Sequence, residues 1–343
     1  MDKKKVVVGL SGGVDSAVAA LLLKKEGYEV VGVTMKQFAS ENFSEDAKAV
    51  ADVLGIEHLV VDMVEDFKKS IMDYFVSEYE KGRTPNPCTM CNPLVKWEAL
   101  IRVADKVSAY YVATGHYANI DKVGDRYSIK NAKTALKDQT YALCNLSQEQ
   151  LQRTLMPLGG YEKEEVRKLA KEAGIPVADK KDSQDICFIP DGDYGKFLEE
   201  YTGKKSKKGK FVDVNGKVLG PHEGIDKYTI GQRKGLGIAM GHPVFVVAIR
   251  PETYEVVIGE NDDLFTTDFT VSNMNFMCGT KEKLPLRLVC KIRYAHKGTE
   301  CELSKAEDGK WSVHFLEPVR AITPGQTAVF YEGEYVFCAG AID

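Results

Sequence analysis

The chain has 343 residues, enough for two or three domains, and its 44% hydrophobic and 28% charged content is typical of a globular protein. No apolar run approaches the ~20 residues of a membrane span, and Met1–Lys5 leads into a strand pattern without a signal-peptide apolar region. We therefore expect a cytoplasmic protein with no membrane partner, whose eight cysteines are thiols rather than a disulfide framework. The net charge of −4 gives no overall attraction to nucleic acid, so RNA binding would need local positive charge.

The first half of the chain alternates strand and helix patterns. The expected strands are Val6–Leu10, Glu29–Met35, His58–Val61 and Tyr110–Thr114. The expected helices are Ala17–Glu26, a helix capped by Ser44 that runs to Leu54, Glu65–Glu80, Lys96–Val107, Leu151–Leu158 and Lys163–Ala173. This alternation predicts an α/β domain with a parallel sheet, whose ligands bind at the carboxyl ends of the strands.

A glycine-rich turn follows the first strand. Ser11-Gly12-Gly13 separates that strand from the first helix, so backbone N–H groups and the helix N-terminus can approach a phosphate. No Gly-Lys-Ser/Thr follows, which excludes the P-loop pattern. Ser11–Ser16 instead resembles the pyrophosphate loop of ATP pyrophosphatases, although an ordinary tight turn would also fit. Asp15 is a candidate Mg²⁺ ligand, or simply a carboxylate in the first helical turn.

The segment Arg83–Pro93 carries three prolines and predicts a rigid loop without regular structure. It holds Cys88 and Cys91, and Cys187 lies far along the chain. With no second close pair, a structural zinc site is disfavoured. Cys91 is a candidate for carrying or releasing sulfur. The other five cysteines are interpreted as buried and inert: Cys144, Cys278, Cys290, Cys301 and Cys338.

Beyond Gly203 the patterns are mostly β, which predicts one or two small barrels. Asn215-Gly216 is a hairpin signal, and Lys204–Lys210 is a basic segment that is either a solvated loop or an RNA contact. Expected strands are Lys210–Val214, Phe245–Ile249, Tyr254–Ile258, Leu286–Tyr294, Trp311–Phe315 and Thr327–Phe330. The expected domains are an ATP-binding catalytic domain at residues 1–202, a small central β domain at 203–264 and a C-terminal β-barrel that contacts RNA at 265–343.

Taken in order, eight segments resemble the tRNA-specific 2-thiouridylase family over essentially the whole chain. They are Ser11–Ser16, Arg83–Asn92, Gly115–Ala118, Lys137–Tyr141, Asp182–Ile189, Tyr228–Ile238, Lys291–Tyr294 and Arg320–Gln326. The resemblance implies an adenine nucleotide alpha hydrolase-like α/β domain, followed by mostly-β central and C-terminal barrel domains.

The resemblance also implies a reaction. ATP, with Mg²⁺, would adenylate O2 of the wobble uridine, position 34, in the tRNA anticodon loop, and sulfur would then replace that oxygen to give 2-thiouridine, AMP and pyrophosphate. A sulfur-donor protein would load a persulfide onto Cys187, and Cys91 would act as the partner nucleophile and form a disulfide with Cys187.

Site residues follow from the same resemblance. The nucleotide would be bound by Gly9, Leu10, Ser11, Gly12, Gly13, Val14, Asp15, Ser16, Met35 and Gly115. The target base would meet Asn86, Pro87 and Cys88, and the rest of the tRNA would meet His116, Lys137, Asp138, Gln139, Arg293, Tyr294 and Gln326. Separate domains would thus hold an everted base and an RNA backbone.

Two departures from the family pattern matter. The family carries Asp, proposed as an acid–base group, where this chain has Cys88. Cys88, Cys91 and Cys187 could therefore hold a 4Fe–4S cluster that binds sulfide, as an alternative to the persulfide route. The segment Lys36–Ser44 is also shorter than the family usually shows, which reduces the surface over the nucleotide.

Two rival functions remain. One is another ATP-pyrophosphatase-type enzyme, either tRNA-modifying or amide-forming, which would not need Cys91 and Cys187. The other is a non-enzymatic RNA-binding module, which the intact Ser11–Ser16 loop argues against.

Overall fold

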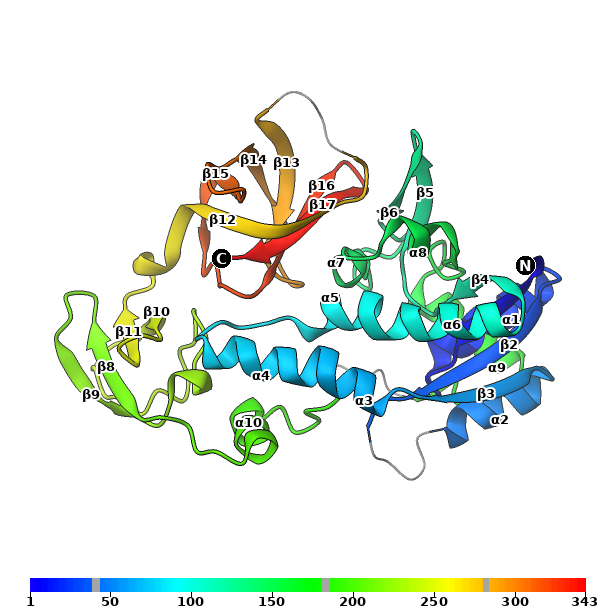
Figure 1. Cartoon of the computed structure of the whole chain (residues 1–343), viewed down its shortest axis with the longest axis horizontal. Coiled ribbons are helices and arrows are strands. Elements are labelled where there is room, and N and C mark those ends of the chain that lie inside the picture. The colour runs from blue at the N-terminus through cyan, green and yellow to red at the C-terminus, as the bar shows by residue number, and fades with distance from the viewer. Residues whose placement is uncertain (39–43, 181–185, 280–283) are drawn as a thin grey trace.

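The computed structural model describes residues 1–38, 44–180, 186–279 and 284–343. Most of the shortened segment after Met35, and the first residues of the motif that contains Cys187, lie outside these ranges. Figure 1 shows the parallel sheet with its helices, a small β domain at the opposite end of the molecule and a β-barrel beside both.

The N-terminal sheet is parallel, with strand order β3-β2-β1-β4-β7, as predicted. Its strands are β1 (Asp2–Gly9), β2 (Glu29–Lys36), β3 (Glu57–Asp62), β4 (Ala109–Ala113) and β7 (Thr154–Leu155). The helix expected at Leu151–Leu158 was wrong beyond Gln152, because Thr154 and Leu155 pair with β4 instead. That pairing depends on a distant strand and leaves no local pattern.

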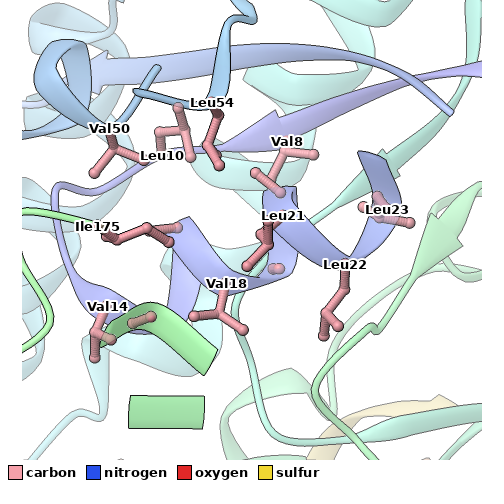
Figure 2. Packing of buried hydrophobic residues seen from close by; sticks show 14 of the residues in the cluster. Val8, Leu10, Val14, Val18, Leu21, Leu22, Leu23, Val50, Leu54 and Ile175 are labelled. Carbon is pink, nitrogen blue, oxygen red and sulfur yellow. The ribbon is translucent and has the colours of Figure 1, made fainter. Parts of the chain in front are cut away.

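Helices cover both faces of this sheet. The helical elements before residue 203 are α1 (Val14–Lys25), α2 (Glu45–Leu54), α3 (Val64–Phe67), η1 (Lys68–Met72), α4 (Asp73–Glu80), α5 (Pro87–Cys91), η2 (Asn92–Trp97), α6 (Glu98–Lys106), α7 (Thr140–Leu143), α8 (Gln148–Gln152), α9 (Lys163–Glu172) and α10 (Tyr194–Thr202). Of these, α4 and α10 pack on each other away from the sheet. Alternate residues of β1 face opposite cores. Val8 packs with α1 (Figure 2), and Val7 packs with Trp97 and Leu100.

The prediction of an irregular loop at residues 83–93 was wrong in its second half. The Asn86 side chain caps α5 by accepting a hydrogen bond from the backbone N–H of Cys88 at 3.1 Å. Pro87 occupies the first helical position, where a missing N–H costs nothing. The chain then continues through η2, which begins at Asn92 and Pro93, into α6. Both cysteines therefore sit on a helical turn, which holds them more firmly than a loop.

The central region forms the sheet β10-β11-β8-β9. Its elements are β8 (Gly209–Asp213), β9 (Val218–His222), η3 (Ile225–Lys227), β10 (Phe245–Arg250), β11 (Glu255–Gly259) and η4 (Asp262–Leu264). The hairpin predicted at Asn215-Gly216 is confirmed, because β8 and β9 pair antiparallel on either side of it.

The C-terminal strands close into a barrel, as predicted. In the described part of the chain six strands follow the order β12-β15-β14-β13-β16-β17, and an added β12–β17 pairing completes the ring. They are β12 (Phe265–Phe276), β13 (Leu286–Lys291), β14 (Thr299–Lys305), β15 (Trp311–Arg320), β16 (Thr327–Glu332) and β17 (Tyr335–Ile342). An unpredicted hairpin, β5 (Asn119–Val123) and β6 (Arg126–Lys130), joins β17 and links the barrel to the first domain.

The predicted burial of Cys144, Cys290, Cys301 and Cys338 is confirmed, while Cys278 is only partly buried. None of the helices in the described ranges is long and apolar enough to cross a membrane.

Candidate functional site

The turn between β1 and α1 is held in shape by its own hydrogen bonds. The Ser16 hydroxyl donates to the Gly13 carbonyl at 3.0 Å and accepts from the Ser11 N–H at 3.2 Å. Gly12 adopts a φ of 71°, in the left-handed region that favours glycine. The first N–H groups of α1 follow directly, so this turn can bind a phosphate by backbone donors and the helix dipole.

A cavity of about 340 Å³ lies beside this turn, at the carboxyl ends of β1, β2 and β4. Its lining includes nine of the predicted residues: Gly9, Leu10, Ser11, Asp15, Ser16, Met35, Gly115, His116 and Gln139. Five lining residues were not predicted: Thr34, Gln37, Phe38, Lys96 and Thr114. Gly12 and Gly13 form the turn itself, and Val14 is buried in the core. The cavity is large enough for part of a nucleotide.

Gly115 brings the end of β4 against the start of α1. A Cβ atom placed on Gly115 would lie 2.5 Å from the backbone nitrogen of Ser16 and 2.6 Å from the carbonyl carbon of Asp15. Only glycine allows this approach, which forms one wall of the cavity.

Asp15 has protein partners for both carboxylate oxygens. The Lys163 ammonium, from a buried side chain, donates to Oδ1 and Oδ2 at 2.8 Å each, and the Tyr117 hydroxyl donates to Oδ1 at 2.8 Å. A Mg²⁺ ion at Asp15 would have to displace this ammonium. Through these bonds Asp15 links α1 to α9, which carries Lys163, and to the segment after β4, which carries Tyr117.

His116 faces the cavity as a neutral imidazole. Burial, with a smaller effect of the nearby Lys96 charge, lowers the pKa of His116 to about 3. Its Nδ1 lies 2.8 Å from the Thr114 hydroxyl, and its ring lies 5.8 Å from that of Trp97. The ring is uncharged, and its other nitrogen makes no contact with Thr114, so this nitrogen is suited to a hydrogen bond with a base or ribose.

Cys91 and Cys187 share one environment at the edge of the cavity. Cys91 is buried, and the cavity residue Gln37 donates to its Sγ at 3.7 Å. Burial raises the pKa of Cys91 to about 11; the charge of Lys96 acts in the opposite direction, and Cys187 and Cys88 raise it further. Cys187 is exposed, but partial desolvation by the surrounding chain still raises its pKa, and Lys96 acts in the opposite direction. Both thiols are therefore protonated at neutral pH.

Phe188 places Cys187 at this position. Its ring lies 5.6 Å from Phe67, 5.4 Å from Phe75 and 5.1 Å from Phe197. Phe67 belongs to the same apolar cluster as Cys91. A local aromatic anchor thus explains how two cysteines distant in sequence come together.

The three cysteines near the cavity are free thiols, with Cys88 and Cys187 exposed. Thiols suit an iron–sulfur cluster chemically. Across the described ranges, however, no group of three His, Cys, Asp or Glu side chains is arranged to hold a metal ion. The arrangement of these thiols therefore does not fit a cluster as it stands.

The remaining predicted residues lie outside this cavity. Asp138 accepts hydrogen bonds from the Ala132 and Thr140 N–H groups, so it shapes its own loop, which Lys137 also belongs to. Asn86 and Pro87 form the start of α5. Arg293 and Gln326 line a second cavity of about 320 Å³, with Thr84 and Gly231, where the three regions of the chain meet. Tyr294 is exposed and donates to the Asp138 carbonyl at 3.1 Å.

Lys96 is the functional candidate that the sequence patterns missed. It lies on η2, five residues after Cys91, and its side chain is partly buried in the cavity wall. Its place on the same continuous helix as Cys91 was the available signal. That signal was hidden because residues 83–93 were expected to form a loop and the helix was expected to begin only at Lys96.

Three domain families match the chain in order. The tRNA methyl transferase HUP domain matches residues 4–191, the tRNA methyl transferase PRC-barrel domain matches 195–260 and the Aminomethyltransferase beta-barrel domain matches 266–342. A tRNA-specific 2-thiouridylase MnmA from Lachnoclostridium phytofermentans is 51% identical over 354 residues, covering 99% of each chain. One from Acetivibrio thermocellus is 48% identical over 358 residues, covering 100% of each. Among solved structures, a 4-thiouridine synthetase–RNA complex with bound ATP is 21% identical, covers 57% of this chain and 50% of its own, and has a TM-score of 0.36.

Proposed function

Since this chain belongs to the tRNA-specific 2-thiouridylase family, we propose that it activates O2 of wobble uridine 34 with ATP and replaces that oxygen with sulfur carried by Cys187. The enzyme is a tRNA-uridine sulfurtransferase. The observation that supports the proposed mechanism is that Gln37 and Lys96 line a cavity with room for part of a nucleotide and also lie close to Cys91, with Lys96 close to Cys187 as well.

In the first step, uridine O2 attacks the α-phosphorus of ATP as N3 loses its proton. An O2–P bond forms, the bond to the β-phosphate breaks and pyrophosphate leaves. Ser11, Gly12, Gly13 and the start of α1 would bind the phosphates, and Met35 and Gly115 would border the nucleoside. Mg²⁺ enters as the metal of Mg·ATP, because Lys163 occupies the Asp15 carboxylate.

In the second step, the terminal sulfur of a Cys187 persulfide attacks C2, and AMP leaves with the oxygen. Cys91 Sγ then attacks Cys187 Sγ as its thiol proton passes to the departing base, where N3 lost a proton in the first step; the S–S bond to the transferred sulfur breaks and 2-thiouridine is released. A Cys91–Cys187 disulfide remains, and an external thiol must reduce it before the next persulfide is loaded. Burial of Cys91 protects the thiol from oxidation between turnovers.

The substrate and donor follow from this chemistry. The anticodon loop would meet Asn86, Pro87 and His116 near the cavity, while Arg293, Tyr294 and Gln326 would contact RNA from the barrel side. We assign activation to residues 1–202 and RNA positioning to 203–264 and 265–343. A protein persulfide would supply the sulfur, and the cytoplasm holds both tRNA and such donors.

The test is mass spectrometry of tRNA after incubation with ATP, Mg²⁺ and a persulfide donor. A uridine that gains the mass difference of sulfur for oxygen supports the function, and its absence would refute it. Cys91→Ser and Cys187→Ser should each abolish sulfur transfer while ATP–pyrophosphate exchange with tRNA continues. Full product formation by the double variant would instead support the amide-forming or other tRNA-modifying enzyme.

Cys88 separates the persulfide route from an iron–sulfur route. Cys88→Asp and Cys88→Ser should retain transfer from a persulfide donor, since the thiol of Cys88 has no part in the steps above. Loss of transfer in both variants, with about four irons per chain in anaerobically purified protein, would favour a cluster at the three cysteines.

A further inference from the structure

Lys96 lies where the nucleotide cavity meets the sulfur chemistry. Its side chain lines the cavity together with Ser11, Gly115 and His116. Its charge also acts on His116, Cys91 and Cys187, which places the ammonium near groups from three separate segments of the chain. A cation at this junction lies between the phosphate-binding turn and the two thiols.

In the described part of the chain, this cation has no anionic partner. Across residues 1–38, 44–180, 186–279 and 284–343, no hydrogen bond or ion pair involves the Lys96 ammonium. Among the described residues, the carboxylate that lines the cavity is Asp15, and it is bound by Lys163. Partly buried charges are stabilised by pairing, so an ammonium in the cavity wall beside the phosphate-binding turn is well placed to bind an anion of a ligand.

The alternative anions are unsuited to Lys96 in the resting enzyme. Both neighbouring thiols are protonated at neutral pH, because burial outweighs the effect of Lys96 on them. His116 is neutral. The phosphate-binding turn, by contrast, occupies the adjacent wall and would hold a group that is always anionic.

We propose that Lys96 is a catalytic residue that contacts the α-phosphate of the nucleotide and stabilises its negative charge during both the adenylation of uridine and the departure of AMP. The proposal rests on the proposed function and adds a residue to it. In adenylation, Lys96 would neutralise the oxygens of the five-coordinate phosphorus while the O2–P bond forms and the bond to pyrophosphate breaks. In sulfur transfer, the same contact would stabilise AMP as it leaves with the oxygen of C2.

The expected effect is large because the contact strengthens as charge develops in a partly desolvated site. Removing a single preorganised donor of this kind slows a reaction by about 10²–10³-fold. Lys96→Met keeps the length and apolar stem of the side chain and removes its charge. Lys96→Arg keeps the charge and should restore part of the rate.

The test measures each step with saturating tRNA and ATP. Lys96→Met should slow both ATP–pyrophosphate exchange and single-turnover formation of 2-thiouridine by about 100-fold, with little change in the dissociation constant for tRNA. Lys106→Met is the matched control, since Lys106 is exposed on α6, further along the same helical segment. It should retain wild-type rates.

A second measurement detects the contact itself. ATP carrying sulfur on the α-phosphate exists as two diastereomers, and a lysine that contacts one oxygen makes the wild-type enzyme prefer one of them. Lys96→Met should lose this preference, which a general loss of structure would not cause, and Lys96→Gln serves as a second neutral variant should Lys96→Met fold poorly.

Three outcomes decide the question. Wild-type exchange rates in both neutral variants would overturn the proposal. A normal exchange rate with slow sulfur transfer would also overturn it, because Lys96 would then serve the thiols. If the wild-type enzyme itself forms no 2-thiouridine, the proposed function fails, whatever the Lys96 variants do.

Discussion

Charge pairing of single residues decides what the cavity can bind. Asp15 is neutralised by Lys163, and His116 is kept uncharged by burial, so Lys96 is left as the cavity cation without a partner in the described chain. The same polar groups that line a nucleotide cavity in the folded protein would all be hydrated in the unfolded chain. The lowered pKa of His116 therefore links the site to the stability of the protein.

His116 should make the protein sensitive to acid. Its pKa is about 3 when folded and ~6.5 when unfolded, so the unfolded state binds the extra proton. The stability that this histidine contributes is complete above pH ~6.5 and falls by up to about 1.4 kcal/mol per unit as the pH drops toward 3. Urea unfolding at pH 7.5 and 5.0 should show a smaller acid loss for His116→Gln than for the wild type.

The control for this measurement is His242→Gln, because His242 is exposed on the surface. It should lose as much stability as the wild type between the two pH values. Equal losses in wild type and His116→Gln would contradict the neutral, buried state of His116.

At the scale of elements, the site depends on where strands end and helices begin. The end of β4 meets the start of α1 at Gly115, α5 presents Cys91, and the segment before α10 presents Cys187. Each of these junctions can be disturbed without touching a charged group.

Gly115→Ala should separate β4 from α1, because the added Cβ would lie 2.5 Å from the Ser16 nitrogen. Overpacking of this kind costs about 1–3 kcal/mol, and we expect ATP binding to weaken at least ~10-fold, the equivalent of 1.4 kcal/mol. Urea unfolding and isothermal titration with ATP measure the two effects. Gly160→Ala is the matched control, since its Cβ would meet open space; similar losses in both variants would refute the packing explanation.

Phe188→Ala should release Cys187 from its position. The three aromatic contacts of Phe188 are each worth about 0.5–1.5 kcal/mol beyond their buried area. We expect sulfur transfer to fall about 10-fold, or 1.4 kcal/mol, while ATP–pyrophosphate exchange stays near the wild-type rate. Phe265→Ala, at an exposed phenylalanine, should change neither rate. An equal fall in exchange would show that Phe188 supports the whole domain and not Cys187 in particular.

At the scale of the whole molecule, residues 83 and 84 join the first domain to the barrel. The Arg83 guanidinium donates to the Ile342 carbonyl at 2.8 Å and pairs with Glu78. The Thr84 N–H donates to the Pro324 carbonyl at 2.8 Å, and Gln326 donates to the Thr84 carbonyl at 2.8 Å. These contacts lie four and five residues before Cys88, so they set the position of the barrel relative to α5 (Figure 1).

Arg83→Met should loosen the contact between the first domain and the barrel and weaken tRNA binding, because the RNA-binding surfaces of the two domains would no longer be held in a fixed relative position. Hydrogen bonds from charged groups contribute about 1.5–3 kcal/mol, so a loss of about 10-fold in tRNA affinity is expected. ATP affinity should not change. Filter binding and calorimetry measure the two constants, and Arg287→Met, at an exposed barrel residue, is the control. Unchanged tRNA affinity in Arg83→Met would argue against a shared RNA surface.

Much of the fold could be predicted from the sequence, because a buried strand such as residues 6–10 or a hairpin turn such as Asn215-Gly216 carries its own local pattern. The helix α5, the strand β7 and the hairpin β5–β6 could not. A proline-rich segment became helical because Asn86 caps it, and Thr154 became part of a strand because β4 lies beside it.

The sequence by itself determined the chemistry that is available: a phosphate-binding turn at Ser11–Ser16 and thiols at Cys91 and Cys187. Only the tertiary structure decided which of these groups are free to act. Lys163 neutralises Asp15 from 148 positions away, and Phe188 carries Cys187 to the cluster around Cys91. The physical reason is that charge pairing and burial depend on contacts between distant segments, and these contacts place Lys96 in the cavity wall with no partner among the residues that the structure describes.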